Sequence, residues 1–225
     1  MYRIVLSATA LLALGVAAAS ADDIDTCKNW ASDGSIAACS RLIVRNPRDA
    51  VLYSNRGAAY NSKGEHDRAI ADFDEAIRLN PNYAVAYNNR GWAYNGKGEY
   101  DHAIADLDQA IRLDPKQAMF YNNRGNAYRG KGDYDRAIFD YDRAIGLDPK
   151  NVFAWNSRGF AYNSKGDHDR AIADFDQAIR LNSNYAIAYR WGSDRASRAA
   201  DEGVSPLPPR SPPERQRLYA PADCP

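Results

Sequence analysis

The chain has no net charge, since 29 basic residues balance 29 acidic ones among its 225 residues. Such a balance gives no general attraction to nucleic acid or to an anionic membrane surface. Glycine-rich phosphate loops, Cys-x-x-Cys pairs and nucleophile elbows are also missing from the sequence. We therefore expect no nucleic-acid partner, no cofactor and no enzymatic activity.

Proline is scarce in the body of the chain and abundant at its end. Of the 11 prolines, four recur at intervals of 34 residues, at Pro47, Pro81, Pro115 and Pro149, and seven lie beyond residue 205. The second group, mixed with polar residues, leaves too little apolar side chain to build a core. We expect residues 203–225 to form a disordered, proline-rich tail.

The interval between the first prolines is the period of a block that occurs four times. Numbering each copy from 1 to 34 and starting at Ala50, the copies cover residues 50–83, 84–117, 118–151 and 152–185. Position 8 is always glycine, at Gly57, Gly91, Gly125 and Gly159, and position 20 is always alanine, at Ala69, Ala103, Ala137 and Ala171. A fixed period of this length is typical of repeat architectures.

Each copy reads as two helices joined by a short turn. Aromatic residues at positions 4 and 11 lie on one helical face, as do apolar residues at positions 21, 24 and 28. Lys63-Gly64 and its equivalents are typical of a helix end, and Asn80-Pro81 ends the second helix. The first copy therefore predicts helices over residues 51–63 and 66–79. The small residues at positions 8 and 20 allow these two helices to cross closely, because larger side chains would overpack the crossing.

This pattern resembles the tetratricopeptide repeat over residues 50–185. The resemblance implies an all-α fold, a right-handed superhelical solenoid of helix-turn-helix repeats. Four units suffice for a continuous core. Position 7 departs from the family, because Arg56, Arg90, Arg124 and Arg158 stand where leucine is usual. Ser183 also replaces the proline of the last copy.

The N-terminus predicts export. Residues 1–21 contain a basic start at Arg3, an apolar run from Ile4 to Ala19, and the small-residue site Ala19-Ser20-Ala21. These features are typical of a cleaved signal peptide. A membrane anchor is the weaker alternative, because the apolar run is short for a span. We expect a periplasmic or secreted protein with no stable membrane span after cleavage.

Residues 22–49 align with a shortened copy of the repeat. Cys39 takes position 24, and one deleted residue in the turn places Cys27 at position 11. Positions 11 and 24 meet in the other copies, as Tyr60 and Phe73 do, so we predict a Cys27–Cys39 disulfide. The chain-entropy description assigns about 3 kcal/mol to a loop of this size. Two buried free cysteines are the alternative, which export makes less favourable. Cys224, in the tail, is either unpaired or an intermolecular link.

A further copy begins after Tyr185 and then loses register, because Gly192 arrives one residue early. We expect residues 186–202 to form a capping helix in which Ile187 and Trp191 cover the end of the array. An altered reading frame fused to a truncated array is the alternative.

Two sets of residues are of the types found in catalytic or metal sites, but their spacing does not fit such a site. Every copy contains Asp-x-Asp, as at Asp72 and Asp74, but residues two apart on a helix diverge. We interpret these aspartates as solvated partners of the basic residue four positions earlier, such as Arg68. His66, His102 and His168 lack further ligands at metal-binding spacing and are interpreted as surface residues.

The resemblance also implies that the first helices line a concave face. There the chain carries columns of amides, which can both donate to and accept from a peptide backbone, together with aromatic side chains. The predicted peptide-binding residues are Asn55, Asn88, Asn89, Trp92, Asn122, Asn123, Asn126, Asn156 and Phe160. The columns are similar to the asparagine ladders of related superhelical repeats. They do not match the lysine-based carboxylate clamp for chaperone tails.

We expect a protein or peptide partner, which the sequence does not identify, and it leaves the oligomeric state open. A small-ligand or glycan-binding module that uses the same face is the alternative function.

Overall fold

The computed structural model describes residues 21–182, which contain ten α-helices and no strand. The helices are α1 (Ala21–Lys28), α2 (Ser35–Arg45), α3 (Ala50–Ser62), α4 (His66–Leu79), α5 (Ala84–Lys97), α6 (Tyr100–Leu113), α7 (Ala118–Gly130), α8 (Tyr134–Leu147), α9 (Val152–Ser164) and α10 (His168–Leu181). They form five antiparallel pairs, from α1 with α2 to α9 with α10. The fold is therefore all-helical, as the sequence predicts, and α3 lies one residue earlier than the expected 51–63.

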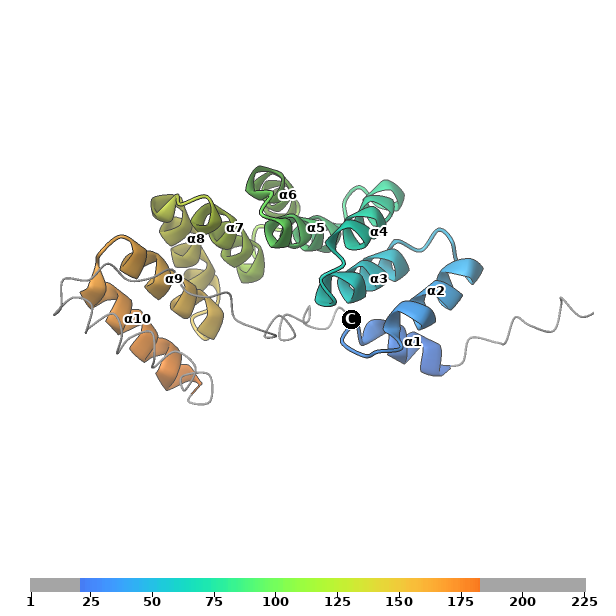
Figure 1. Cartoon of the computed structure of the whole chain (residues 1–225), viewed down its shortest axis with the longest axis horizontal. Coiled ribbons are helices and arrows are strands. Elements are labelled where there is room, and N and C mark those ends of the chain that lie inside the picture. The colour runs from blue at the N-terminus through green and yellow to red at the C-terminus, as the bar shows by residue number, and fades with distance from the viewer. Residues whose placement is uncertain (1–20, 183–225) are drawn as a thin grey trace, which may run out of the picture.

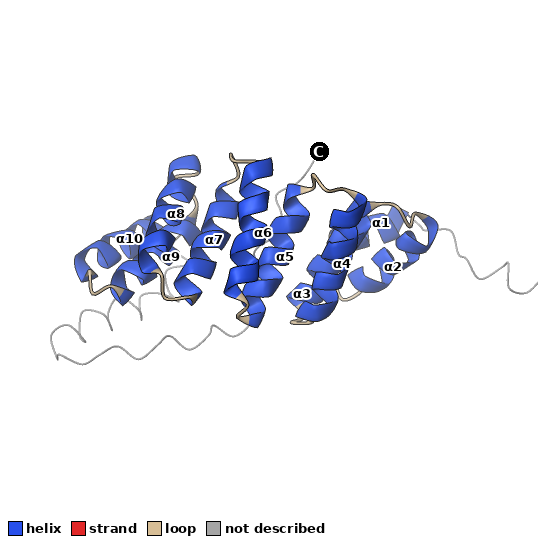
Figure 2. Cartoon of the chain, turned by 90° about the horizontal axis from the view of Figure 1, so that it is seen from above, coloured by secondary structure: helices blue, strands red, loops and turns tan. Residues whose placement is uncertain are grey.

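The pairs follow one another in chain order and form an arc (Figures 1 and 2). The first helices α3, α5, α7 and α9 lie on the inner side of this arc, and the second helices lie on its outer side (Figure 1). Consecutive first helices pack against one another, α3 on α5, α5 on α7 and α7 on α9. The first helices expose one surface on the side opposite the second helices. We call this surface the inner face.

A glycine follows the end of the first helix in each of the four complete pairs. Gly64, Gly98, Gly132 and Gly166 have φ between 77° and 81°, the left-handed region that favours glycine. The reverse turns between pairs begin at a helix C-cap such as Asn80, whose backbone N–H donates to Ala76. The Lys-Gly and Asn-Pro signals of the sequence therefore mark real helix ends.

Position 8 is glycine because the paired helices touch there. A Cβ added to Gly125 would lie 2.7 Å from a ring carbon of Tyr141, and one added to Gly57 would lie 2.8 Å from Phe73. Both rings are fully buried. The large side chain at position 24, aromatic in three copies and Leu107 in the second, thus occupies the space that a side chain at position 8 would need.

The shortened N-terminal pair has a disulfide in place of an aromatic contact. Cys27 of α1 and Cys39 of α2 are bonded, with their Cα atoms 4.8 Å apart. Both cysteines are buried with Ala38 and Leu42, and Leu52 of α3 packs against this cluster. The disulfide therefore lies inside the core that joins the N-terminal pair to the first complete repeat.

Three regions named above lie wholly or almost wholly outside the described residues. They are the expected signal peptide, of which only Ala21 is described, the expected capping helix at 186–202, and the tail at 203–225. Between residues 21 and 182, none of the helices has the length and apolar character needed to cross a membrane.

Candidate functional site

Each first helix presents two opposite sides to two different environments. Positions 4, 7 and 11 point towards the second helices: Arg158 reaches aspartates on both α8 and α10, and Tyr162 stacks with Arg170 of α10. At 3.6 residues per turn, positions 2 and 9 lie on the other side of the helix. Phe153 and Phe160 of α9 therefore belong to the inner face, and the Phe160 ring also packs edge-on against the buried ring of Phe175 in α10, with 5.1 Å between the ring centres.

Five of the predicted peptide-binding amides are buried. Their exposed fractions are 1% for Asn88, 8% for Asn89, 0% for Asn122, 6% for Asn123 and 5% for Asn156. They occupy positions 5 and 6, where consecutive first helices pack against each other. Their burial limits the atoms that they can offer to a ligand, and their role in binding a peptide stays a prediction.

These amides form hydrogen bonds to one another across a repeat boundary. Asn123 Nδ2 of α7 donates to Asn88 Oδ1 of α5 at 2.9 Å, and Asn88 Nδ2 donates to Asn89 Oδ1 at 3.0 Å. A buried amide needs such partners, because an unsatisfied polar group costs about 1–3 kcal/mol. The Asn123–Asn88 bond therefore joins α7 to α5, whereas Oδ1 of the buried Asn156 has no hydrogen-bond partner within residues 21–182.

The other four predicted residues, Asn55, Trp92, Asn126 and Phe160, are half-buried. Asn126 accepts a hydrogen bond of 2.9 Å from the hydroxyl of Tyr141, a buried ring at position 24. The guanidinium of Arg129 lies 6.0 Å from the centre of the Phe160 ring, which brings α7 and α9 side by side on this face. Asn126 and Phe160 are thus held in place by neighbours that the sequence pattern does not reveal.

The large half-buried apolar residues at positions 2 and 9 complete the inner face. We call them the inner strip; it consists of Val85, Trp92, Met119, Phe153 and Phe160. They come from three consecutive first helices, α5, α7 and α9, so the strip crosses the repeat boundaries.

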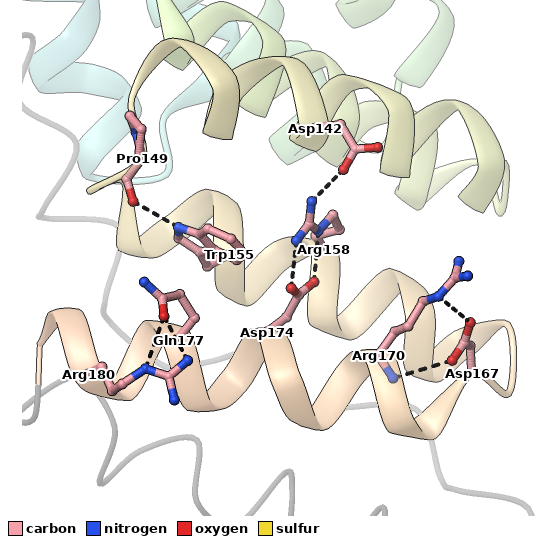
Figure 3. A network of polar contacts seen from close by, with 9 residues as sticks. All are labelled: Asp142, Pro149, Trp155, Arg158, Asp167, Arg170, Asp174, Gln177 and Arg180. Atoms are coloured by element: carbon pink, nitrogen blue, oxygen red, sulfur yellow. Dashed lines mark hydrogen bonds and ion pairs between the residues drawn. The ribbon is translucent and has the colours of Figure 1, made fainter.

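The paired aspartates do not have the partners expected from the sequence. Arg158 donates through Nε and Nη2 to Asp174 at 2.8 and 2.6 Å, and through Nη1 to Asp142 at 2.5 Å (Figure 3). Figure 3 shows its guanidinium between the two outer helices that carry these carboxylates. Arg90 and Arg124 make the same contacts, with Asp106 and Asp74 and with Asp140 and Asp108. The arginines at position 7 therefore bridge successive second helices.

The interpretation of these aspartates as solvated partners of the residue four positions earlier is wrong. Asp140 is 1% exposed, and Arg136 pairs with Asp133 in the turn instead. Helix spacing alone favoured the local pair, whereas the close crossing of paired helices brings Arg124, 16 residues away, to Asp140. The signal was present, because an arginine at position 7 and aspartates at positions 23 and 25 recur together.

Burial and hydrogen bonding act in opposite directions on the charges of this arrangement. The hydrogen bonds from Arg124 to Asp140 raise the pKa of the guanidinium above its ordinary value. Burial raises the pKa of the Asp140 carboxyl, and the same hydrogen bonds oppose that effect. When arginine holds a carboxylate with two hydrogen bonds, both carboxylate oxygens already have a partner. These residues therefore form a structural clamp, which leaves the inner face as the candidate functional site.

The histidines are placed in two ways. Nδ1 of His66 lies 2.6 Å from Asn61 Oδ1, and that of His168 lies 3.0 Å from Asn163 Oδ1, whereas His102 pairs on the surface with Glu99. His66 is thus partly buried rather than a simple surface residue, and burial lowers its pKa. Within residues 21–182, no group of three or more His, Cys, Asp or Glu side chains could hold a metal ion.

Comparison with known proteins agrees with this architecture. The chain matches the family description "Tetratricopeptide repeat" at residues 50–83, 118–151, 152–185 and 73–105, and "TPR repeat" at residues 91–132. Among curated proteins, no relative matches.

Solved structures with the same fold include a crystal structure of MamA, at 30% identity and a TM-score of 0.59, covering 68% of this chain and 90% of that one. The thermophilic TPR protein TTC0263 of Thermus thermophilus is 22% identical with a TM-score of 0.65, covering 73% of this chain and 90% of that one. The first TPR domain of Spaghetti (RPAP3), bound to the HSP90 peptide SRMEEVD, is 25% identical with a TM-score of 0.50, covering 52% and 94%.

Proteins of this kind are typically non-enzymatic scaffolds. The matches together extend over residues 50–185, and the described helices pack pairwise as such repeats do. The chain belongs to the tetratricopeptide repeat family.

Proposed function

We propose that the inner face binds extended peptide segments of a partner protein and that the chain acts as a non-enzymatic scaffold. The observation that carries this proposal is the inner strip, a row of half-buried apolar side chains on three helices. An extended peptide lying across first helices would contact several of these side chains at once. Large aromatic residues such as Trp92 commonly anchor such interfaces.

The amides divide between two roles in this proposal. Asn88 and Asn123 help to fix the spacing of α5 and α7, because their amide groups bond to each other. Asn55 and Asn126, which are half-buried, offer polar groups to the peptide backbone. The RPAP3 domain bound to an HSP90 peptide supports peptide binding as the general activity. The acidic sequence of that peptide is not expected to bind here, because the corresponding positions carry amides in place of lysines.

Export to the cell envelope belongs to the same proposal. The signal-like residues 1–21 and the Cys27–Cys39 disulfide support it, since disulfides persist in oxidising compartments. N-terminal sequencing of the protein recovered from fractionated cells tests it. We expect a mature chain that begins at Asp22 in the periplasm or medium, and a cytoplasmic chain that retains Met1 would contradict it.

A peptide library selected on the immobilised protein tests the binding role. Peptides selected by the wild type should bind the Trp92→Ala, Phe160→Ala double variant at least about tenfold more weakly, since each lost aromatic anchor commonly costs more than 1 kcal/mol. Phe139→Ala is the matched control, because Phe139 lies on the outer helix α8 and is 62% exposed. Equal loss in both variants, or no selected peptide at all, would contradict the proposal. Enrichment of glycans in a parallel glycan array, without peptides, would favour the alternative.

A further inference from the structure

The inner strip has a chemical character that restricts its ligand. Trp92, Phe153 and Phe160 supply aromatic rings, and Arg129 stacks beside one of them at 6.0 Å. Asn126 lies between these rings in the column of position 9 and is itself held by Tyr141. Rings separated by fixed hydrogen-bonding groups are the surface on which proline-rich segments dock, because proline packs on aromatic faces while the free backbone carbonyls accept hydrogen bonds.

The chain carries such a segment itself. Residues 205–213 read Ser-Pro-Leu-Pro-Pro-Arg-Ser-Pro-Pro, with further prolines at Pro221 and Pro225. Proline restricts φ in the free chain, so a segment of this composition loses less conformational entropy on binding than an ordinary peptide. Leu207 adds one apolar side chain to this segment.

Because residues 205–213 are covalently connected to the array, a weak intrinsic affinity is enough for them to occupy the inner strip most of the time. Only residues 182–204 separate this segment from the end of α10. Covalent linkage of a ligand to the protein that binds it gives an effective concentration on the order of 1 mM when the linker spans the distance to the site. A segment with an intrinsic Kd of about 0.1 mM would then occupy its site about nine-tenths of the time, and a competing peptide would bind about tenfold more weakly.

We propose that residues 205–213 bind to the inner strip of the same molecule and compete with partner peptides for it. This inference rests on the proposed function of the inner face and names a first ligand for it. The consequence is a self-masked scaffold, which a partner must displace before it binds.

Site-specific crosslinking in the full-length protein tests the contact directly. A photoreactive amino acid replaces Leu207, and the crosslinked products are digested and identified by mass spectrometry. We expect crosslinks within one molecule to residues 84–97 of α5, 118–130 of α7 or 152–164 of α9. Crosslinks confined to the outer helices α4, α6 and α8, or found only between two molecules, would overturn the proposal.

A binding experiment, in which a labelled tail peptide competes with the tail of the protein itself, provides a second test. The full-length variant Pro206→Gly, Pro208→Gly, Pro209→Gly keeps the length of the tail and replaces three of the five prolines in residues 205–213. A labelled synthetic peptide of residues 203–218 should bind this variant about tenfold more tightly than it binds the wild type. Adding Trp92→Ala to the variant should abolish that binding, whereas adding Phe139→Ala should leave it intact.

The two proposals fail in different ways. If library peptides bind through Trp92 but the 203–218 peptide does not bind the glycine variant, the self-masking inference is wrong and the peptide-binding function stands. If neither the library peptides nor the 203–218 peptide bind through Trp92, both are wrong. Equal affinity of the 203–218 peptide for wild type and glycine variant would also overturn self-masking.

Discussion

At the scale of single residues, the arginine at position 7 shows how a departure from the family pattern gains a structural role. Arg56 illustrates the rule at the end of the array, where it donates to Asp72 and, at 3.2 Å, to the hydroxyl of Ser40. Ser40 stands one repeat before Asp74, so a neutral acceptor replaces the carboxylate in the shortened N-terminal pair. The clamp therefore adapts to the residue that the preceding helix offers.

Neutralising the buried carboxylate of a clamp should destabilise the fold. Asp140→Asn leaves Arg124 facing an amide in a site where the carboxylate is 1% exposed, and breaking a buried pair costs about 3–5 kcal/mol. Urea unfolding followed by circular dichroism measures the loss. Asp176→Asn is the control, because Asp176 is exposed and forms no ion pair within residues 21–182. A similar loss in both variants would contradict the clamp.

His66 should make stability depend on pH. Burial lowers its pKa from 6.5, Lys97 lowers it further, and Asp67 opposes them. The unfolded chain therefore takes up a proton at a higher pH than the folded one, so the contribution is fully present above about pH 6.5 and is lost as the pH falls through and below that value.

The midpoint of urea unfolding, measured at several pH values, tests this dependence. The wild type should lose more stability between about pH 7.5 and 5.5 than His66→Gln does. Parallel curves for the two proteins would show that the imidazole of His66 does not contribute.

At the scale of helices, the crossing at position 8 supplies the clearest test. Gly125→Ala should lower stability by about 1–3 kcal/mol, because the new Cβ would lie 2.7 Å from the buried ring of Tyr141. Gly146→Ala is the matched control in α8, since nothing lies within 4 Å of its added Cβ. It should stabilise by up to about 1 kcal/mol through helix propensity. Thermal unfolding compares the two, and opposite signs are the expected result.

The N-terminal pair should depend on its disulfide. Reduction, or replacing Cys27 and Cys39 together by alanine, should remove about 3 kcal/mol from this pair by the chain-entropy description. Amide hydrogen exchange in α2 should then accelerate, while exchange in α7, several helices away, stays as it was. Unchanged exchange in α2 would show that the contacts of Leu42 and Leu52 suffice without the bond.

The helices were largely predictable from sequence, and the outer clamps were not. Glycine at position 8, the Lys-Gly turns and the Asn-Pro ends are local signals, and each recurs with the period. The partners of Asp72 and Asp74 depend on how helices cross, which local spacing does not contain. Burial of Asn88 and Asn123 likewise follows from contact between neighbouring first helices, so the sequence revealed the amide column without revealing that its members bond to each other.

At the scale of the whole molecule, different contacts join the repeats on the two sides of the arc. On the outer side, arginine clamps such as Arg158 join successive second helices, and on the inner side the Asn123–Asn88 hydrogen bond joins α7 to α5. Together they fix the relative position of the repeats. A scaffold held in this way can present the inner strip as one surface across α5, α7 and α9, which no single repeat could do.

The two tryptophans on α5 and α9 test the binding face most directly. Trp92 belongs to the inner strip, whereas Trp155 points to the other side of its helix and donates to the carbonyl of Pro149 at 2.9 Å (Figure 3). Each indole N–H gives a separate signal in a nitrogen-15 correlation spectrum, assigned by Trp92→Phe and Trp155→Phe. Titration with a selected peptide should shift the Trp92 signal and leave the Trp155 signal in place. A peptide that shifts Trp155 and not Trp92 would contradict binding at the inner face.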